Sequence, residues 1–595
     1  RWRSNMYERL ATLALLFALV PASPACAAGD TSAQAESAQS ARPAQTQGFT
    51  PVPGADLKSK LDEAARRGRA GSKSAPFWVA YTFDVRPGIA IDPAVEQFSG
   101  SMENFSGITV FRGKVNGVTV ETRNLGLFLL HDPQGQAVTR AEIYNLERKR
   151  EYSGYPVYWL GRAGNEESLN YLLGLVESAR ASRVAETATV ALAVHDDRRV
   201  NDMLKGLVRQ SKNREVRKTS AFWLGHLGGE HAFLSELVRN EREDRELREA
   251  AAHAVGLSRD DAALAALQAL YGSVADKDVR AAVVHSAAHN ENEPAASAFL
   301  LRVARTDRSP DVKRQAVHRL AQFDNEQTVE ELMKIYAADR DEDVRQGVLH
   351  AFSQMTNARA HARLLEIARS GDDIESRAQA IHWLGQRKGE GTLDELMSIY
   401  NADRNREIRE KVLHAFFQMD DPRAYAKLLE IARSGDDPEV RQQAIHWIGQ
   451  RKGEAAVEDL SGLYRAERDT EVKSQILHAF FQMDSPRALD KLFEAARGGE
   501  SAELRQQALH WLGQKAGERS LSALSEAANS SGADTDVQLQ AVHAISQRPA
   551  AEAVPLLIQL ARTHRNPEVR RAAIQRLTQS GDPRALEFIR EVLTK

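Results

Sequence analysis

Apolar and polar positions follow two different periods along this chain. From about residue 146 to the C-terminus, apolar residues recur every three or four positions, which is the spacing of an amphipathic helix. One such segment follows Asp437 and a proline and stops at Gly453, and the segment before it runs from Asp421 to Gly435. Aspartate with proline is a typical helix start, and glycine is a typical helix end. The pattern predicts pairs of short helices, which must stack because a single pair cannot bury its apolar face.

Before this region the period changes to two. In PFWVAYTFDV, which starts at Pro76, large apolar residues alternate with others, as expected of a half-buried strand. Asn116 and Gly117 stand between two further strand-like runs and are typical of a two-residue hairpin turn. We therefore expect a small antiparallel β domain over residues 76–145, which serves either as a cap on the first repeat or as a separate recognition domain.

Nearly identical sequence segments of the helical region repeat at a fixed spacing. AIHWLGQRKGE begins at residue 380 and returns at 444 as AIHWIGQRKGE and at 508 as ALHWLGQKAGE, so that the copies lie 64 residues apart and hold two 32-residue repeats each. Extending the register to Phe222, Val190 and Tyr158 on one side, and to Gln575 on the other, predicts about 14 repeats. One histidine marks the same position in ten of them: His253, His285, His318, His350, His382, His414, His446, His478, His510 and His543.

The residues of each second helix identify the kind of repeat. Asp437, Val440, Arg441 and Ala444, followed by an aliphatic residue and Gly449, give the pattern D-x-x-V-R-x-x-A-x-x-x-L-G. This pattern resembles the short HEAT-like repeats first associated with phycobilisome lyases, whereas the motifs of ankyrin and tetratricopeptide repeats are missing. The resemblance covers residues 146–595 and implies a mainly α fold, an α-solenoid. It implies no single function, because such repeats serve many.

Two further side chains recur with the repeat. The resemblance implies that the arginine of the pattern pairs with acidic groups along the stack: Arg217, Arg248, Arg280, Arg345, Arg377, Arg409, Arg441, Arg505 and Arg570. The tryptophans directly after the register position are expected to pack between repeats, with a partly exposed aromatic rim as the alternative: Trp159, Trp223, Trp383, Trp447 and Trp511.

The polar side of the second helix offers the candidate binding site. Val440, Ala444 and Ile448 lie on one side of that helix, and His446 and Gln450 lie on the other. Because the second helix of HEAT-like repeats usually lines the concave surface, we expect a ligand-binding groove there. Helices ~10 Å apart and an extended chain of ~3.3 Å per residue give about three ligand residues per repeat. The groove is expected to hold His318, Gln322, His350, Gln354, His382, Gln386, His414, Gln418, His446, Gln450, His478, Gln482, His510, Gln514, His543 and Gln547.

Two alternatives to a binding role stay open for these side chains. Either they form hydrogen bonds between neighbouring helices or they simply face water, since duplication alone would copy them. Ordinary histidine titrates near pH ~6.5, so we expect a ladder that is in use to become cationic in mild acid.

The N-terminus has the features of a secretory signal over residues 1–28. Arg9 precedes the apolar run Leu10–Val20, which is too short to span a bilayer, and Ala25 and Ala27 fit the cleavage rule. We expect no lipid anchor at Cys26, because the residues before it lack the large aliphatic side chain of lipoprotein signals. Residues 29–75 are rich in Ala, Ser, Gln and Pro and predict a flexible linker, with a short helix over 58–70. The mature protein is therefore expected to be periplasmic or secreted, from a bacterium.

Composition narrows the function further. Charged residues make up 27% of the chain with a net charge of -3, whereas nucleic-acid binding requires a clearly basic surface. No catalytic motif stands at a meaningful spacing, and His285 and His289 have no third metal ligand nearby in sequence. We expect no catalytic residue, metal or cofactor, and a scaffold that binds a protein or extended peptide. The alternatives are a lyase- or chaperone-like accessory acting on a cofactor or client, and a passive cell-surface spacer.

Overall fold

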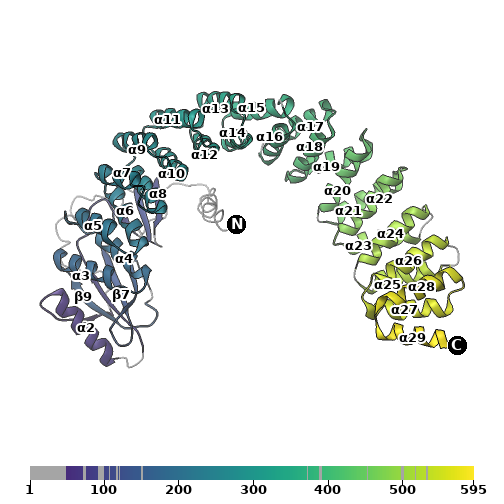
Figure 1. Ribbon diagram of the computed structural model, residues 1–595, viewed down its shortest axis with the longest axis horizontal. Helices are drawn as coiled ribbons and strands as arrows, with labels where there is room; N and C mark the ends of the chain where they lie inside the picture. The colour runs from purple at the N-terminus through teal and green to yellow at the C-terminus, as the bar shows by residue number, and fades with distance from the viewer. Residues whose placement is uncertain are drawn as a thin grey trace, which may run out of the picture. The chain divides into compact units, whose positions relative to one another are not determined.

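The chain forms two compact units, residues 1–220 and 221–595. Its computed structural model describes residues 48–71, 75–91, 99–105, 108–115, 118–119, 121–148, 150, 152–371, 373–387, 391–451, 453–497, 501–515, 517–530 and 534–594 (Figure 1). The predicted signal peptide and residues 29–47 and 72–74 of the predicted linker lie outside this part. Within it, no helix has both the length and the apolar character needed to cross a membrane.

The main sheet of the first unit is mixed, not antiparallel as predicted. Its strands are β1 (Thr50–Pro51), β9 (Val157–Arg162), β2 (Phe77–Thr82), β7 (Leu125–His131) and β8 (Val138–Asn145), in that spatial order. Strands β2, β7 and β8 pair antiparallel, whereas β9 runs parallel to both β1 and β2. The sheet therefore extends past the boundary predicted at residue 146. VYWLGR, which we expected in a first repeat, is aromatic and β-branched and pairs along its backbone with strands on both sides.

A second, smaller sheet has the order β3 (Ala90–Ile91), β5 (Ile108–Val115) and β4 (Ser99–Phe105), with β6 (Val118–Thr119) paired to β5. Val115 lies opposite Val118, which confirms the hairpin predicted at residues 116–117, although those two residues lie outside the described part.

Strand β2 is buried on both faces, so the prediction of a half-buried strand was wrong. Phe77 contacts Gly68 of helix α2 (Leu57–Gly71), and Trp78 on the other face packs with Phe128 and Val157. Helix α2 confirms the short helix predicted near residues 58–70. Because α2 packs on the sheet with Leu57, Ala64 and Gly68 buried, this part of the expected linker belongs to the folded unit.

From residue 165 onward the chain is helical. Two alternating series of helices follow one another. The first helices are α3 (Asn165–Ser178), α5 (Val200–Gln210), α7 (His231–Arg239), α9 (Asp261–Ser273), α11 (Glu293–Thr306), α13 (Glu326–Ala338), α15 (Ala358–Ser370), α17 (Thr392–Ala402), α19 (Pro422–Ser434), α21 (Glu454–Ala466), α23 (Pro486–Arg497), α25 (Glu518–Asn529), α27 (Ala550–Thr563) and α29 (Pro583–Thr594). The second helices are α4 (Ser182–Ala193), α6 (Arg214–Leu227), α8 (Arg245–Gly256), α10 (Lys277–Ala287), α12 (Pro310–Leu320), α14 (Glu342–Gln354), α16 (Ile374–Gln386), α18 (Arg406–Gln418), α20 (Pro438–Gln450), α22 (Thr470–Gln482), α24 (Ala502–Gln514), α26 (Thr535–Ser546) and α28 (Pro567–Ser580).

The predicted repeat register holds in every second helix, from Val190 in α4 to Gln575 in α28. The fourteenth repeat, predicted at Tyr158, is wrong because Tyr158 lies in strand β9. The predicted helix starts are confirmed, since the Asp437 side chain accepts hydrogen bonds from two backbone N–H groups of α20 and Asp421 accepts one in α19.

Within the second unit, the second helices form the inner layer of the stack. Neighbouring second helices contact each other far more extensively than neighbouring first helices do. In a curved stack the layer whose members are closer together lies on the inside. Figure 1 shows α12 and α14 along one edge of this unit, and α11 and α13 along the other. The second helices, which carry the predicted groove residues, therefore form the concave side of this unit.

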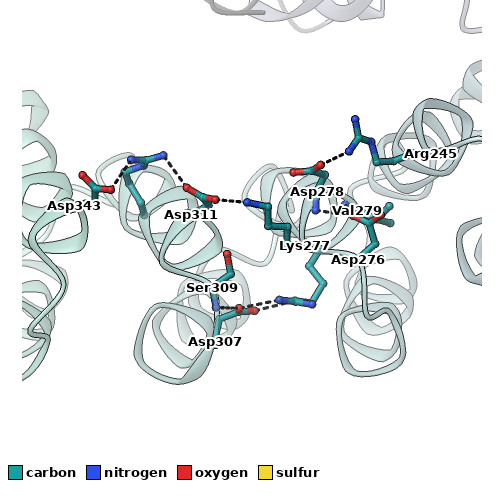
Figure 2. A network of polar contacts seen from close by, with 11 residues as sticks. Arg245, Asp276, Lys277, Asp278, Val279, Asp307, Ser309, Asp311 and Asp343 are labelled. Atoms are coloured by element: carbon teal, nitrogen blue, oxygen red, sulfur yellow. Dashed lines mark hydrogen bonds and ion pairs between the residues drawn. The ribbon is translucent and has the colours of Figure 1, made fainter.

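In six repeats the recurring arginine pairs with an acidic residue of the next repeat, as the resemblance implied, whereas Arg217, Arg248 and Arg570 donate to backbone oxygens of their own repeats. The Arg280 guanidinium lies 3.0 Å from the Asp307 carboxylate, and Lys313, which replaces the arginine, lies 2.7 Å from Asp339. Figure 2 shows Asp307 between Ser309 and the preceding helix, together with a second row of ion pairs that includes Lys277–Asp311 at 2.7 Å. Pairs of the same kind are Arg345–Asp373, Arg377–Asp403, Arg409–Asp436, Arg441–Glu467 and Arg505–Asp534.

Candidate functional site

The predicted groove residues share one arrangement. Each of the eight histidines from His318 to His543 is partly buried, and each glutamine four residues later is exposed. In five pairs the glutamine Nε2 lies 3.0–3.3 Å from the Nε2 of its own histidine: His350–Gln354, His382–Gln386, His414–Gln418, His478–Gln482 and His510–Gln514. The amide donates and the imidazole accepts, which requires a neutral ring.

Two of the glutamines form hydrogen bonds between repeats, whereas the histidines contact neighbouring repeats through their rings. Gln450 donates to the side-chain oxygen of Gln482 at 2.9 Å, and Gln322 donates to the backbone oxygen of Ala288. Some histidine rings lie closer together than the ~10 Å expected between helices. His318 and His350 stack with ring centroids 5.8 Å apart, and His382 and His414 stack at 6.4 Å. These four histidines therefore form two close pairs.

Three tryptophans pack against ladder histidines of the preceding second helix. Trp447 lies against His414 and Phe417 of the preceding second helix, with ring centroids 4.8 Å away in both cases. Trp383 and Trp511 lie in the same way against His350 and His478. Their packing between repeats confirms the prediction, and because all three are partly exposed they also border the groove. Of the remaining two, Trp223 is fully buried and Trp159 lies in strand β9.

The spacing of the second helices alternates for a steric reason. A Cβ atom at Gly449 of α20 would lie 2.7 Å from the Cβ of Ala479 in α22, so these helices meet closely. On the opposite side of α20, the stacked rings of Trp447 and Phe417 hold α18 at a distance. Because the small and the large pairs both recur every 64 residues, close and wide joints alternate along the stack.

At one wide joint the groove is hollow. A cavity of about 430 Å³ opens between α14 and α16, and it is lined by His350, Ser353, Gln354, Met355, Thr356, Trp383, Gln386 and Arg387. Ser353 stands where the later copies have Phe417 and Phe481, so the missing ring leaves this space. The sequence signal of this space is the change from LHAFFQM at residues 413–419 and 477–483 to LHAFSQM at residues 349–355.

The cavity also contains a cation that the prediction missed. Arg387 Nη1 lies 3.1 Å from the backbone oxygen of Phe352 and 2.9 Å from that of Met355, at the end of α14. Arg451 and Lys515 bind the end of the preceding second helix in the same way. A cation at a helix C-terminus satisfies unpaired carbonyls and complements the helix dipole.

Burial changes the charge of the ladder. It lowers the pKa of His350, His382 and His414, and it lowers the pKa of His253 to about 4. Burial also lowers the pKa of His318, His446, His478 and His543. These rings are neutral at pH 7, in agreement with their role as acceptors. The expectation that the ladder becomes cationic near pH 6.5 is corrected toward stronger acid.

A second group of polar side chains lies inside the first unit. His195 Nδ1 donates to the backbone oxygen of Ala191 at 2.6 Å, Ser168 donates to His195 Nε2 at 2.9 Å, and the Tyr81 hydroxyl lies 3.1 Å from Ser168 Oγ. Although serine beside histidine suits nucleophilic catalysis, all three side chains are fully buried, so no substrate reaches them. In the described part of the chain, no three His, Cys, Asp or Glu side chains are placed to hold a metal.

Comparison with known proteins adds the family. No curated protein matches the sequence. Similar solved structures include the karyopherin Kap121p bound to the extreme C-terminus of the protein phosphatase Cdc14p (12% identity over 70% of this chain and 54% of that chain, TM-score 0.36). Another is human deoxyhypusine hydroxylase in complex with glycerol (16% identity, 42% and 95% covered, TM-score 0.20). The chain spans about half the length of the Kap121p chains that it matches.

The family model for HEAT repeats matches residues 200–288, 297–375, 362–446, 425–513, 489–560 and 521–595. These segments cover more than half of the sequence and coincide with the stacked helix pairs. The chain therefore belongs to the HEAT-repeat family.

Proposed function

We propose that this protein is a scaffold that binds an extended segment of a partner protein along its inner layer of second helices. The observation that carries the proposal is the cavity between α14 and α16, where exposed glutamines and a partly exposed tryptophan meet. It combines the two requirements of peptide recognition, hydrogen-bonding groups for the backbone and an apolar surface for a side chain.

The histidines support this function indirectly. Gln386 is held by the Nε2 of His382 at 3.0 Å, and Gln354 is held by His350 at 3.1 Å. A glutamine that is already fixed by its histidine loses less side-chain entropy when a peptide binds. Its side-chain oxygen remains available to accept a backbone N–H of the partner. The pairs thus act as preoriented contacts, repeated at a spacing of about three peptide residues.

Binding of a partner identified by crosslinking in extracts can be measured with purified proteins by calorimetry. Gln386→Ala removes one of these contacts, and Ser353→Phe fills the cavity with the residue of the later copies. Each lost contact of about 1 kcal/mol reduces affinity roughly fivefold, and filling the cavity should reduce it more. The matched control is Gln327→Ala on the first helix α13, where the glutamine is exposed on the outer layer. Equal affinity of all four proteins would refute the groove.

We also propose that the protein is exported and that its repeats are of the phycobilisome-lyase type. The apolar run Leu10–Val20 before Ala25 and Ala27 supports export, and the D-x-x-V-R pattern supports the repeat type. An intact mass that begins after Ala27, measured on protein from the periplasmic fraction, checks the first. A chromophore or client that co-purifies with the protein would favour the lyase- or chaperone-like function over the scaffold.

A further inference from the structure

One repeat of the inner layer has an arginine at the position where its later copies have a tryptophan. Arg319 of α12 follows His318 directly, at the position that Trp383, Trp447 and Trp511 occupy in alternate later repeats. Like those tryptophans it is partly buried. The groove therefore changes from aromatic to cationic at this repeat.

Arg319 has no partner in the part of the chain that the structure describes. Its Nε is buried without an acceptor, and no carboxylate or carbonyl contacts its other nitrogens there. Three more arginines with a buried, unbonded Nε each form an ion pair elsewhere on the guanidinium: Arg345 with Asp373, Arg363 with Glu330 and Arg505 with Asp534. A partly desolvated charge without a counter-ion is unfavourable, and an anion that binds it recovers that cost.

The charge of Arg319 acts on four histidines, His253, His285, His289 and His318. The rings of His253 and His285 lie 5.1 Å apart, and those of His285 and His289 lie 5.2 Å apart. Burial lowers the pKa of His253, His289 and His318, and the charge of Arg319 lowers each of them further. Arg259 acts on His289 in the same direction, and His350 acts on His318. The charged groups that act on these three rings are Arg319 and, for His289, Arg259, and both would attract an anion.

We propose that Arg319 binds an acidic side chain of the partner segment, with His285 and His289 beside the bound carboxylate. The guanidinium offers two parallel N–H donors to a carboxylate, the geometry in which arginine binds most strongly. This inference rests on the proposed function, since the carboxylate belongs to the segment held in the groove. It assigns the position of an acidic residue in that segment, next to α12.

The probes are glutarate, its neutral analogue glutaramide, and inorganic phosphate, added to the full chain with ¹³C-labelled histidine side chains. His285→Gln and His289→Gln assign the two signals. Glutarate should shift both signals saturably in the wild type, and glutaramide should not. The shift should disappear in Arg319→Gln and in Arg319→Trp, which restores the residue of the later copies. Arg340→Gln, which removes an exposed charge from the turn after α13, is the control and should behave as wild type.

Three results would overturn the proposal: no shift with glutarate in the wild type, the same shift in both folded Arg319 variants, or saturation by phosphate at a tenfold lower concentration than by glutarate. The last would assign a phosphate group in place of a carboxylate. Partner binding separates this inference from the scaffold function. If Gln386→Ala weakens binding of the partner and Arg319→Gln does not, the groove is supported and the carboxylate site is refuted. If glutarate binds at Arg319 but neither Gln386→Ala nor Ser353→Phe changes the affinity for the partner, the carboxylate site is kept and the scaffold function is refuted.

Discussion

The same substitution, glycine to alanine, should have opposite effects at two sites in neighbouring helices. Gly449 in α20 faces α22, where an added Cβ would lie 2.7 Å from Ala479 Cβ and 3.2 Å from Ala479 Cα. Carbon atoms in contact prefer about 3.5–4.0 Å, so the two helices must separate by roughly 1 Å. Gly462 lies within α21, and an added Cβ there meets no atom within 4 Å.

The magnitudes follow from two opposing terms. Overpacking a close contact costs about 1–3 kcal/mol, and replacing glycine by alanine inside a helix recovers about 1 kcal/mol. Gly449→Ala should therefore destabilise α20 and α22 by about 1 kcal/mol, whereas Gly462→Ala should stabilise α21 by up to ~1 kcal/mol. The two variants should differ by about 2 kcal/mol in opening free energy, a factor of roughly 30 in the equilibrium constant.

The assay must report local stability, because repeat arrays unfold in parts. Native-state hydrogen exchange of the amides in α20, α21 and α22 gives the opening free energy of each helix. Gly385→Ala should reproduce the effect of Gly449→Ala, because its Cβ would also lie 2.7 Å from an alanine Cβ, that of Ala415. If Gly449→Ala protects its helices as well as Gly462→Ala protects its own, close packing of the second helices does not explain the glycine.

Two further predictions concern charge. Arg441→Gln removes the charged partner of Glu467, whose side chain is 9% exposed and keeps only the backbone N–H groups of Arg468 and Asp469, and this loss should cost about 2 kcal/mol. Arg423→Gln at the exposed pair with Asp421 should cost less than about 0.5 kcal/mol in the same urea titration. Burial lowers the pKa of His195 to about 4, so the unfolded chain, with histidine near ~6.5, binds the proton first. The unfolding free energy of the first unit should thus fall between about pH 6.5 and 4, and His195→Gln should flatten this slope. An unchanged slope would mean that His195 is not titrating; His131, with its pKa lowered to about 4 by burial, contributes the remainder.

The sequence by itself determined the features that depend on residues close together along the chain, such as helix starts and the repeat. Asp437 and Asp421 start their helices because their side chains reach N–H groups two or three residues away. The 64-residue copies determined that the same helix pair, with its histidine and glutamine, recurs in the second unit, and the resemblance to HEAT-like repeats anticipated ion pairs such as Arg280–Asp307.

Only the tertiary structure decided what depends on distances between separate segments. Strand β9 pairs with β2, more than 70 residues earlier in the chain, so its short aromatic run alone does not indicate a strand. The pairing of the histidines and the cavity at Ser353 depend on how closely second helices approach, which Gly449 with Ala479 and Phe417 with Trp447 set from opposite sides of one helix. That Arg319 lacks a counter-ion among the described residues also depends on the tertiary structure, because it follows from the positions of all neighbouring side chains.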